Sequence, residues 1–305
     1  MEITQTNGER RLELQVRRRG KVDQLLRQAL GCSAAVVRTA KSWPDGILLD
    51  GRHVRTDQWA EPGQRLSILI SDRTDGDLAA APGPVDIVYQ DADLLIINKA
   101  PGVAVHPSPG HYDDTLGNFL TWHFRGQDVP FRFRPVNRLD RGTSGLMAAA
   151  RHAYAQERMK GQLHTGDFQR EYLAVCQGRP EEDRGTVDQP IGREDGSVLR
   201  RQVRPDGARA VTHYRVLWSG EGRSLLRLKL ETGRTHQIRV HMAWLGHPLV
   251  GDFLYGEEGP LRRTALHAWK LALTHPLTGQ SLSWTAPLPE DMAALLPGDA
   301  VGRLG

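Results

Sequence analysis

The chain contains 305 residues, enough for one large domain with a sizeable core and a smaller second domain. Its 40 basic and 36 acidic side chains give a net charge of only +4, and the whole excess falls within the first seventy residues, which hold twelve Lys and Arg against eight Asp and Glu. A basic segment on a nearly neutral body is typical of a module that binds a polyanion, although an ordinary soluble surface explains it as well. Cys32 and Cys176 belong to no C-x-x-C pattern, so neither a disulfide framework nor a zinc site is indicated.

Other classes of protein are disfavoured by what the sequence lacks. Residues 1–10 have no apolar core, and no apolar run approaches the roughly 20 residues that a membrane span needs. No G-x-G-x-x-G motif or P-loop accompanies a predicted strand, so no nucleotide cofactor is expected. We therefore expect a cytoplasmic monomer without membrane attachment.

The N-terminal part is predicted to be a small independent unit. Residues 1–10 are assigned to an N-terminal tail, and residues 11–70 are predicted to form two helices and a hairpin. Apolar residues at helical spacing over 22–30 and again over 36–40 indicate the two helices. The Asp-Gly pair at 50–51 lies between apolar runs and is a strong signal for a two-residue hairpin.

The larger domain is predicted from residue 85 to residue 290. Residues 71–84 carry Gly, Pro and Ala without periodicity and are interpreted as the interdomain linker, and residues 291–305 are assigned to a C-terminal tail. Strand-like runs mixed with a few helical patterns favour an α+β fold, with a mixed, largely antiparallel sheet flanked by helices. The strand-like runs are 94–98, 146–150, 172–175, 212–217 and 225–230, and the helical patterns are 115–124, 152–163 and 238–245.

The run V-N-R-L-D-R-G-T-S-G-L at 136–146 is the most informative stretch of the chain. It places Asp140 between two arginines, and neighbouring guanidinium groups favour the charged form of a carboxyl group. We therefore expect Asp140 to remain ionised and able to act as a nucleophile or a base at neutral pH. Gly142 and Gly145 are expected to adopt backbone angles that would strain other residues. For an isolated R-L-D-R tetrapeptide, the ordinary interpretation is a surface salt bridge in a turn.

The run at 136–146 and three other segments of the chain resemble motifs of one family, in the order in which that family places them. The run at 136–146 resembles the signature H-R-L-D-R-x-T-S-G-L of the RluA-like pseudouridine synthases, with Asn137 at the position where His is commonest. Three further segments resemble the same family, and together the matches cover roughly residues 85–290. They are 87–107 (I-V-Y-Q-D to V-H-P), 170–175 (R-E-Y-L-A-V) and 231–252 (E-T-G-R-T-H-Q-I-R-V-H to G-D), with a late echo at 266–268 and 274–276.

This resemblance implies an enzyme that converts uridine in RNA to pseudouridine. The reaction breaks the bond between ribose and the base nitrogen, rotates the uracil and joins carbon 5 to the sugar, with no atoms gained or lost and no cofactor required. The family's fold has an active-site cleft across the α+β sheet. By resemblance, Asp140 is the essential residue, Arg239 pairs with it, and Tyr172 stacks on the base and helps to remove the proton from carbon 5. The sequence does not choose among covalent and elimination routes for the aspartate, and an ordinary buried strand tyrosine is the alternative for Tyr172.

RNA contacts are also implied. Residues 11–70 resemble the small alpha-L RNA-binding domain that is often appended to such synthases, a small α/β unit. Because a paired base hides the bond to be broken, we expect the target uridine to be flipped into a pocket. The residues predicted to contact RNA are Arg17, Arg18, Arg19, Lys21 and Lys41 in the small domain, and Arg138, Arg141, Arg170 and Arg234 in the large one. The alternatives are a solvated charged face for the small domain and a loop brace for Arg141.

Metal and serine chemistry are not expected. His236 and His241 are five residues apart, which separates them by about 140° on a helix and places them on opposite faces of a strand, so they cannot easily share an ion. Thr143 and Ser144 are expected to fix the loop through hydrogen bonds to the backbone, because the motif holds no histidine at a nucleophile-activating position.

Large-subunit ribosomal RNA is the expected substrate, because family members with the appended domain commonly act there, and transfer RNA stays open. One rival is a non-catalytic RNA-binding protein on the same scaffold, although binding alone would not require Asp140, Tyr172 and Arg239 together. A second rival is a glycosidase that uses Asp140 and Glu231 as a carboxylate pair. It leaves the segments around Tyr172 and Arg239 unexplained.

Overall fold

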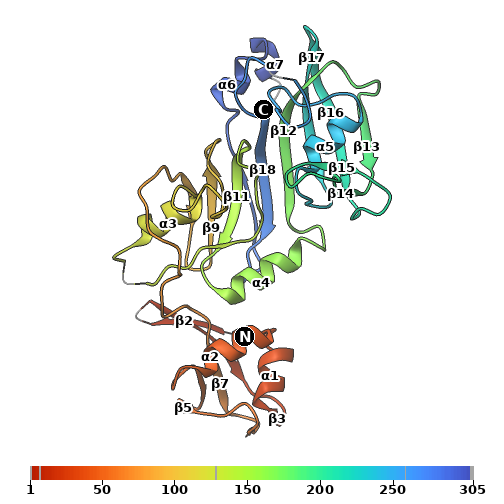
Figure 1. Ribbon diagram of the computed structural model, residues 1–305. Coiled ribbons are helices and arrows are strands. Elements are labelled where there is room, and N and C mark those ends of the chain that lie inside the picture. The colour runs from red at the N-terminus through yellow and green to blue at the C-terminus, as the bar shows by residue number, and fades with distance from the viewer. Residues whose placement is uncertain (1, 7, 128, 258, 303–305) are drawn as a thin grey trace.

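The computed structural model describes residues 2–6, 8–127, 129–257 and 259–302 of the chain. Two separate sheets dominate these residues, a small one near the N-terminus and a large one in the body of the molecule (Figure 1). The predicted limits of the domains remain a prediction, but each sheet has its own helices.

The N-terminal sheet has five antiparallel strands in the order β1-β2-β7-β4-β5. The predicted hairpin is present, because Asp50 and Gly51 both have positive φ angles, 49° and 77°, between β4 and β5. Residues 2–6, assigned from the sequence to a tail, form β1 and pair with β2, so that assignment is corrected. The elements of this part are β1 (Glu2–Thr6), β2 (Glu9–Gln15), β3 (Gly20–Lys21), α1 (Val22–Gln28), α2 (Ala34–Lys41), β4 (Ile47–Leu49), β5 (Arg52–His53), β6 (Trp59–Ala60) and β7 (Arg65–Leu69).

The large sheet confirms the predicted α+β fold. Eight strands follow the order β13-β16-β17-β12-β18-β11-β9-β8, with β10 added to β11 and β19 added to β18, and every pairing is antiparallel except that of β11 with β18. Its strands are β8 (Ile87–Gln90), β9 (Leu94–Lys99), β10 (Arg134–Pro135), β11 (Ser144–Ala150), β12 (Gln169–Gln177), β13 (Arg184–Asp188), β16 (Val211–Gly220), β17 (Arg223–Leu230), β18 (Leu266–Thr274) and β19 (Ser281–Thr285). The accompanying elements are α3 (Leu116–Phe124), α4 (Ala153–Gln162), α5 (Gln237–Trp244), α6 (Glu290–Ala293), α7 (Gly298–Gly302) and the hairpin of β14 (Ile191–Arg193) with β15 (Arg201–Val203).

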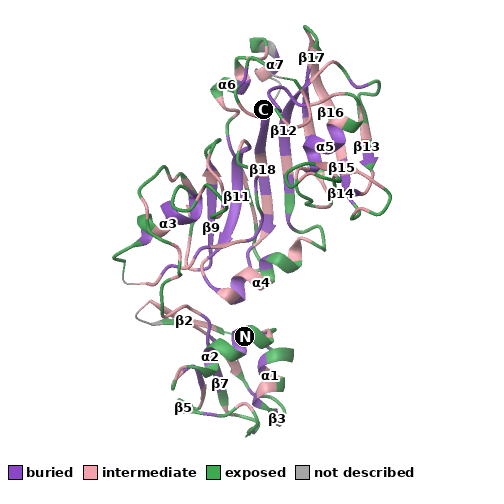
Figure 2. Cartoon of the chain, viewed as in Figure 1, coloured by how far each residue is buried: buried purple, intermediate pink, exposed green. Residues whose placement is uncertain are grey.

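Buried residues are concentrated along the central strands β9, β11, β12 and β18 (Figure 2). Successive residues of β9 point to opposite faces of the sheet. Leu94 and Ile96 therefore enter a core shared with α4 and the N-terminal part, whereas Leu95 and Ile97 enter the core that contains residues of α3 and α5. Both faces of this strand are thus covered, which explains why its sequence is continuously apolar rather than alternating.

The N-terminal part packs directly against α4 and the start of β9. The Tyr154 hydroxyl donates to the carbonyl of Leu30 at 2.7 Å. Arg10 reaches from β2 to Asp93, with 2.8 Å between Nη2 and Oδ2, and His152 contacts the other oxygen of Asp93 at 3.0 Å. The Asp93 carboxylate is 4 % exposed. A buried ion pair therefore joins the two parts of the molecule.

The segment interpreted as a linker also contacts both parts. Arg73 forms ion pairs with Glu9 and Asp45, and Asp72 binds Arg134 of β10 through both oxygens. This ion pair joins β10 to the linker segment.

The C-terminal segment, assigned to a tail, is partly folded: it contributes to α6 and forms α7, and Met292 is fully buried. Residues 303–305 lie outside the described part. In that part, no helix combines the length and apolar character needed to span a membrane.

Candidate active site

Asp140 lies in the loop between β10 and β11, and its side chain is 26 % exposed. The loop turns tightly, because the amide of Thr143 donates to the carbonyl of Asp140 at 3.1 Å. Gly145 then starts the parallel pairing of β11 with β18: its φ is +107°, and a Cβ atom there would lie 2.3 Å from the carbonyl oxygen of Ala268. Gly145 is therefore required for this close approach. The same expectation for Gly142 is wrong, since its φ is not positive and a Cβ would meet nothing closer than 3.6 Å.

The guanidinium group that contacts Asp140 comes from α5 rather than from the neighbouring arginines. Arg239 Nη1 lies 3.3 Å from Asp140 Oδ2, as the family resemblance implied. Within the described residues, neither Arg138 nor Arg141 forms an ion pair with Asp140. Arg138 is exposed, and Arg141 donates from Nε to the carbonyl of Gly102 at 2.9 Å. The expectation that the flanking arginines are the charged partners of Asp140 is corrected: the guanidinium beside it belongs to a residue 99 positions later.

Arg239 is itself held by a second carboxylate. Asp252 accepts from Nε at 2.6 Å and from Nη2 at 2.7 Å, and its side chain is fully buried. Burial opposes the positive charge of Arg239, but Asp252 and then Asp140 outweigh it, so the pKa of Arg239 is raised above its ordinary value. The guanidinium is therefore a permanent cation between two carboxylates.

His236 borders the same carboxylate. It caps the N-terminus of α5 in a left-handed conformation with φ of +58°, which is uncommon for a residue other than glycine. Its Nε2 lies 3.9 Å from Asp140 Oδ2, and its Nδ1 lies 2.8 Å from the hydroxyl of Tyr255. Burial lowers the pKa of His236 below its ordinary value, although Asp140 opposes this shift. The ring is therefore neutral at neutral pH.

Tyr172 lies on β12, where it pairs with Leu228 and Ala268, and it is only 5 % exposed. Burial raises the pKa of its hydroxyl, Arg170 opposes the shift, and the negative charge of Asp140 adds to it. The phenol therefore keeps its proton at neutral pH in the unbound chain.

Lys99, at the end of β9, donates hydrogen bonds to the loop that carries Asp140. It is 1 % exposed, and Nζ donates to the carbonyl groups of Ala100, Val103 and Arg141, which accommodates all three protons of the ammonium form. Burial lowers its pKa to about 7, while Asp140 acts in the opposite direction. A lysine with this pKa beside the aspartate loop can change its charge near neutral pH.

Ser144, at the start of β11, contacts a histidine of β18. Ser144 Oγ lies 3.0 Å from Nδ1 of His267, and both residues are buried. Burial lowers the pKa of His267 to about 4. The motif itself holds no histidine, as expected, and the histidine that meets this serine comes from β18. Asn137 is also structural, because its Oδ1 accepts from the amide of Ala148 at 2.9 Å.

The predicted RNA-contacting residues divide into exposed and buried groups. Arg170 is only 8 % exposed, so its burial argues against a direct contact with phosphate. Arg19 is exposed and forms an ion pair with Glu61 at 2.9 Å. The exposed members of the predicted set are Arg17, Arg18, Arg19, Lys21, Lys41, Arg138, Arg141 and Arg234.

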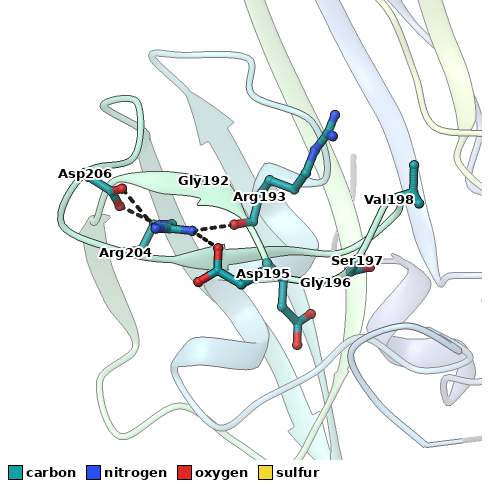
Figure 3. A pocket seen from close by; sticks show the side chains of 9 residues that line it. Gly192, Arg193, Asp195, Gly196, Ser197, Val198, Arg204 and Asp206 are labelled. Atoms are coloured by element: carbon teal, nitrogen blue, oxygen red, sulfur yellow. Dashed lines mark hydrogen bonds and ion pairs between the residues drawn. The ribbon is translucent and has the colours of Figure 1, made fainter.

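A shallow pocket lies away from the aspartate, on the β14–β15 hairpin (Figure 3). Its lining includes Arg204, which donates to Asp206 and Asp195 and to the carbonyl of Arg193 at 2.8 Å. These hydrogen bonds join residues of the hairpin and its flanking turns to one another. The hairpin also contacts the site: the amide of Arg201 donates to the hydroxyl of Tyr255 at 2.8 Å.

Sequence reasoning did not assign site roles to Lys99, Asp252 and Tyr255, and it considered His236 only as a metal ligand. The sequence did hold a signal for Lys99, because a lysine at the end of a buried apolar strand must find hydrogen-bond acceptors inside the protein. Asp252 was present in the quoted G-D motif. Nothing in the sequence pointed to Tyr255.

The chain resembles known proteins over most of its length. Residues 93–244 match the family model described as RNA pseudouridylate synthase. The uncharacterized RNA pseudouridine synthase YjbO of Bacillus subtilis is 40 % identical over 272 residues, covering 88 % of this chain and 96 % of that protein. Ribosomal large subunit pseudouridine synthase D of Escherichia coli is 44 % identical over 229 residues, covering 70 % of each chain. The solved structure of human RNA Pseudouridylate Synthase Domain Containing 1 has a TM-score of 0.55 and 31 % identity, covering 68 % of this chain and 86 % of that one.

The fold and these matches together define an RNA-modifying isomerase, a pseudouridine synthase. Within that class, the chain belongs to the RluA-like family, as the motifs around Asp140 had indicated.

Proposed function

We propose that this pseudouridine synthase modifies uridines of large-subunit ribosomal RNA, with Asp140 as the essential carboxylate. The observation that carries the role of Asp140 is its geometry. One oxygen contacts Arg239 at 3.3 Å, no hydrogen bond to the other is found among the described residues, and the side chain is partly exposed. A carboxylate that is anchored on one side and open on the other suits attack on a sugar or ring carbon and equally suits proton removal.

Tyr172 is proposed to stack on the target base and to take part in removing the proton from carbon 5. Because its side chain is buried, the uracil must be taken out of any helix to reach it, so base flipping is part of the proposal. Because the pKa of Tyr172 is raised, its hydroxyl first acts as a hydrogen-bond donor. It can accept the proton of carbon 5 only as it passes its own proton to a water molecule, so that the phenol is protonated before and after the step.

The choice of ribosomal RNA rests on relatives rather than on the site. Two features support it: the relatives of Escherichia coli and Haemophilus influenzae are both named ribosomal large subunit pseudouridine synthase D, at 44 % and 40 % identity, and Arg17, Arg18 and Arg19 give the N-terminal part an exposed cationic run. Cations along an RNA backbone gain free energy by releasing counterions. The N-terminal sheet and helices are proposed to bind RNA in this way.

The substrate is tested by incubating the protein separately with transcripts of large-subunit ribosomal RNA, small-subunit ribosomal RNA and transfer RNA. New pseudouridines are then mapped by carbodiimide modification and primer extension. We expect modification confined to large-subunit RNA and absent with Asp140→Asn. Modification of transfer RNA alone would overturn the proposed substrate, and salt-sensitive binding without modification of any RNA would favour a non-catalytic binding protein.

A further inference from the structure

Asp252 is a fully buried charged residue to which the proposed reaction assigns no role. It follows Gly251, whose φ is +71° and whose Cβ would lie 2.2 Å from the carbonyl oxygen of Arg263, so that only glycine fits there. Asp252 Oδ1 also accepts from the amides of Leu254 and Tyr255 at 3.1 and 3.3 Å. Its carboxylate is therefore fixed by its own turn before it meets any partner.

This fixed carboxylate occupies one edge of the Arg239 guanidinium. Nε and Nη2 point to Asp252 at 2.6 and 2.7 Å, a bidentate pairing of the kind that arginine and carboxylate groups prefer. Only Nη1 is then directed at Asp140, at 3.3 Å. Without Asp252, Nε and Nη2 would have no other acceptor among the described residues, and Asp140 would be the remaining carboxylate in contact with the guanidinium.

The distinction affects the chemistry of Asp140. A carboxylate paired with arginine through both oxygens has one lone pair of each oxygen engaged by the cation, whereas a carboxylate paired through one oxygen is oriented and keeps every lone pair of the other oxygen free. Asp252 also neutralises the cation, so that the three groups together carry one negative charge. We propose that Asp252 is a positioning residue that restricts Arg239 to a single contact with Asp140 and so leaves one oxygen of Asp140 free to react.

The inference rests on the proposed role of Asp140 and is tested by kinetics. Asp252→Asn keeps the shape of the side chain but presents an amide N–H to the guanidinium, so one of its two bonds to Arg239 is lost. We expect the single-turnover rate of tritium release from RNA labelled at carbon 5 of uridine to fall about 100-fold, the loss typical of a misplaced reacting group. The RNA dissociation constant, measured by filter binding, should change less than twofold.

Asp93→Asn is the matched control. Asp93 is also a buried aspartate paired with an arginine, and it precedes β9 by one residue, at the opposite end from Lys99 and the Asp140 loop. Six residues of extended chain separate these ends by about 20 Å. We expect this variant to lose thermal stability as Asp252→Asn does while keeping the wild-type rate. All rates are measured at a temperature where circular dichroism shows every variant folded.

The outcomes separate the possibilities. A wild-type rate for Asp252→Asn, or a loss of RNA affinity as large as the loss of rate, would overturn the positioning role. If the wild-type protein itself releases no tritium, the proposed function fails and this inference fails with it. If Asp252→Asn does not fold, Asp252→Glu replaces it: the anion is kept but displaced by one methylene, and we expect a smaller loss of rate, again without loss of RNA affinity. A wild-type rate for Asp252→Glu, or an equal loss of affinity, would contradict the proposal.

Discussion

Removing the Arg239 guanidinium should destabilise the fold by an amount that can be worked out from the burial of its partner. Asp252 is 0 % exposed and Arg239 is 5 % exposed, so Arg239→Met leaves the buried Asp252 carboxylate with only two backbone amides as hydrogen-bond donors. Breaking a buried ion pair in this way costs about 3–5 kcal/mol. Since 1 kcal/mol shifts the melting temperature of a domain of roughly this size by about 2–4 °C, we expect the midpoint to fall by about 10 °C.

The double variant Arg239→Met, Asp252→Leu tests the reasoning more sharply. With both charges gone, no unpaired ion remains, and apolar side chains of similar volume often replace a buried pair at little cost. Thermal melting followed by circular dichroism should therefore place the double variant several degrees above the single one, although both lack activity. A single variant that melts with the wild type, or a double variant that melts below the single one, would refute the account of Arg239 and Asp252 as a buried pair.

Three further predictions concern residues around the site and the domain contact. Burial lowers the pKa of Lys99 to about 7 in the folded protein, so between pH 7 and the ordinary pKa of lysine the unfolded chain binds more protons than the folded one. The unfolding free energy of the wild type, relative to that of Lys99→Met, should therefore rise by about 2 kcal/mol from pH 7 to pH 9 in urea unfolding. A difference that stays constant with pH would contradict this prediction. Arg10→Ala should lower the unfolding free energy by about 3 kcal/mol, because the buried Asp93 loses its guanidinium partner and keeps only histidine contacts. Arg55→Ala, which removes a surface pair, should cost under about 1 kcal/mol, and equal losses would argue against the domain contact. Tyr172→Phe should reduce single-turnover tritium release about 100-fold with unchanged RNA affinity, and a wild-type rate would exclude a role for the hydroxyl.

Much of the fold could be predicted because local patterns and tertiary packing agree. The continuous apolar run that ends at Lys99 is buried on both faces, and the Asp50-Gly51 pair forms the hairpin that its positive φ angles allow. The assignment of residues 1–10 to a tail failed for a physical reason. The strand Glu2–Thr6 has few apolar residues and is stabilised by pairing with β2, a partner that local composition does not reveal.

The site divides in the same way. The family resemblance predicted the contact between Arg239 and Asp140, and the structure shows it. The flanking arginines do not pair with Asp140, because adjacency in sequence says little about where side chains point in a turn: Arg141 turns to the carbonyl of Gly102. The contacts of Asp252 with Arg239 and of Lys99 with the carbonyl of Arg141 form only when separate segments meet, and no local pattern encodes these partners.

The most direct test of the central claim is tritium release from RNA carrying uridine labelled at carbon 5, measured for the wild type, Asp140→Asn and Asp57→Asn. Asp57 is an exposed aspartate that pairs with Arg55, so its variant controls for loss of one surface charge. We predict release by the wild type and by Asp57→Asn, and none by Asp140→Asn at equal RNA binding. Release by Asp140→Asn at the wild-type rate would contradict the assignment of Asp140 as the essential carboxylate.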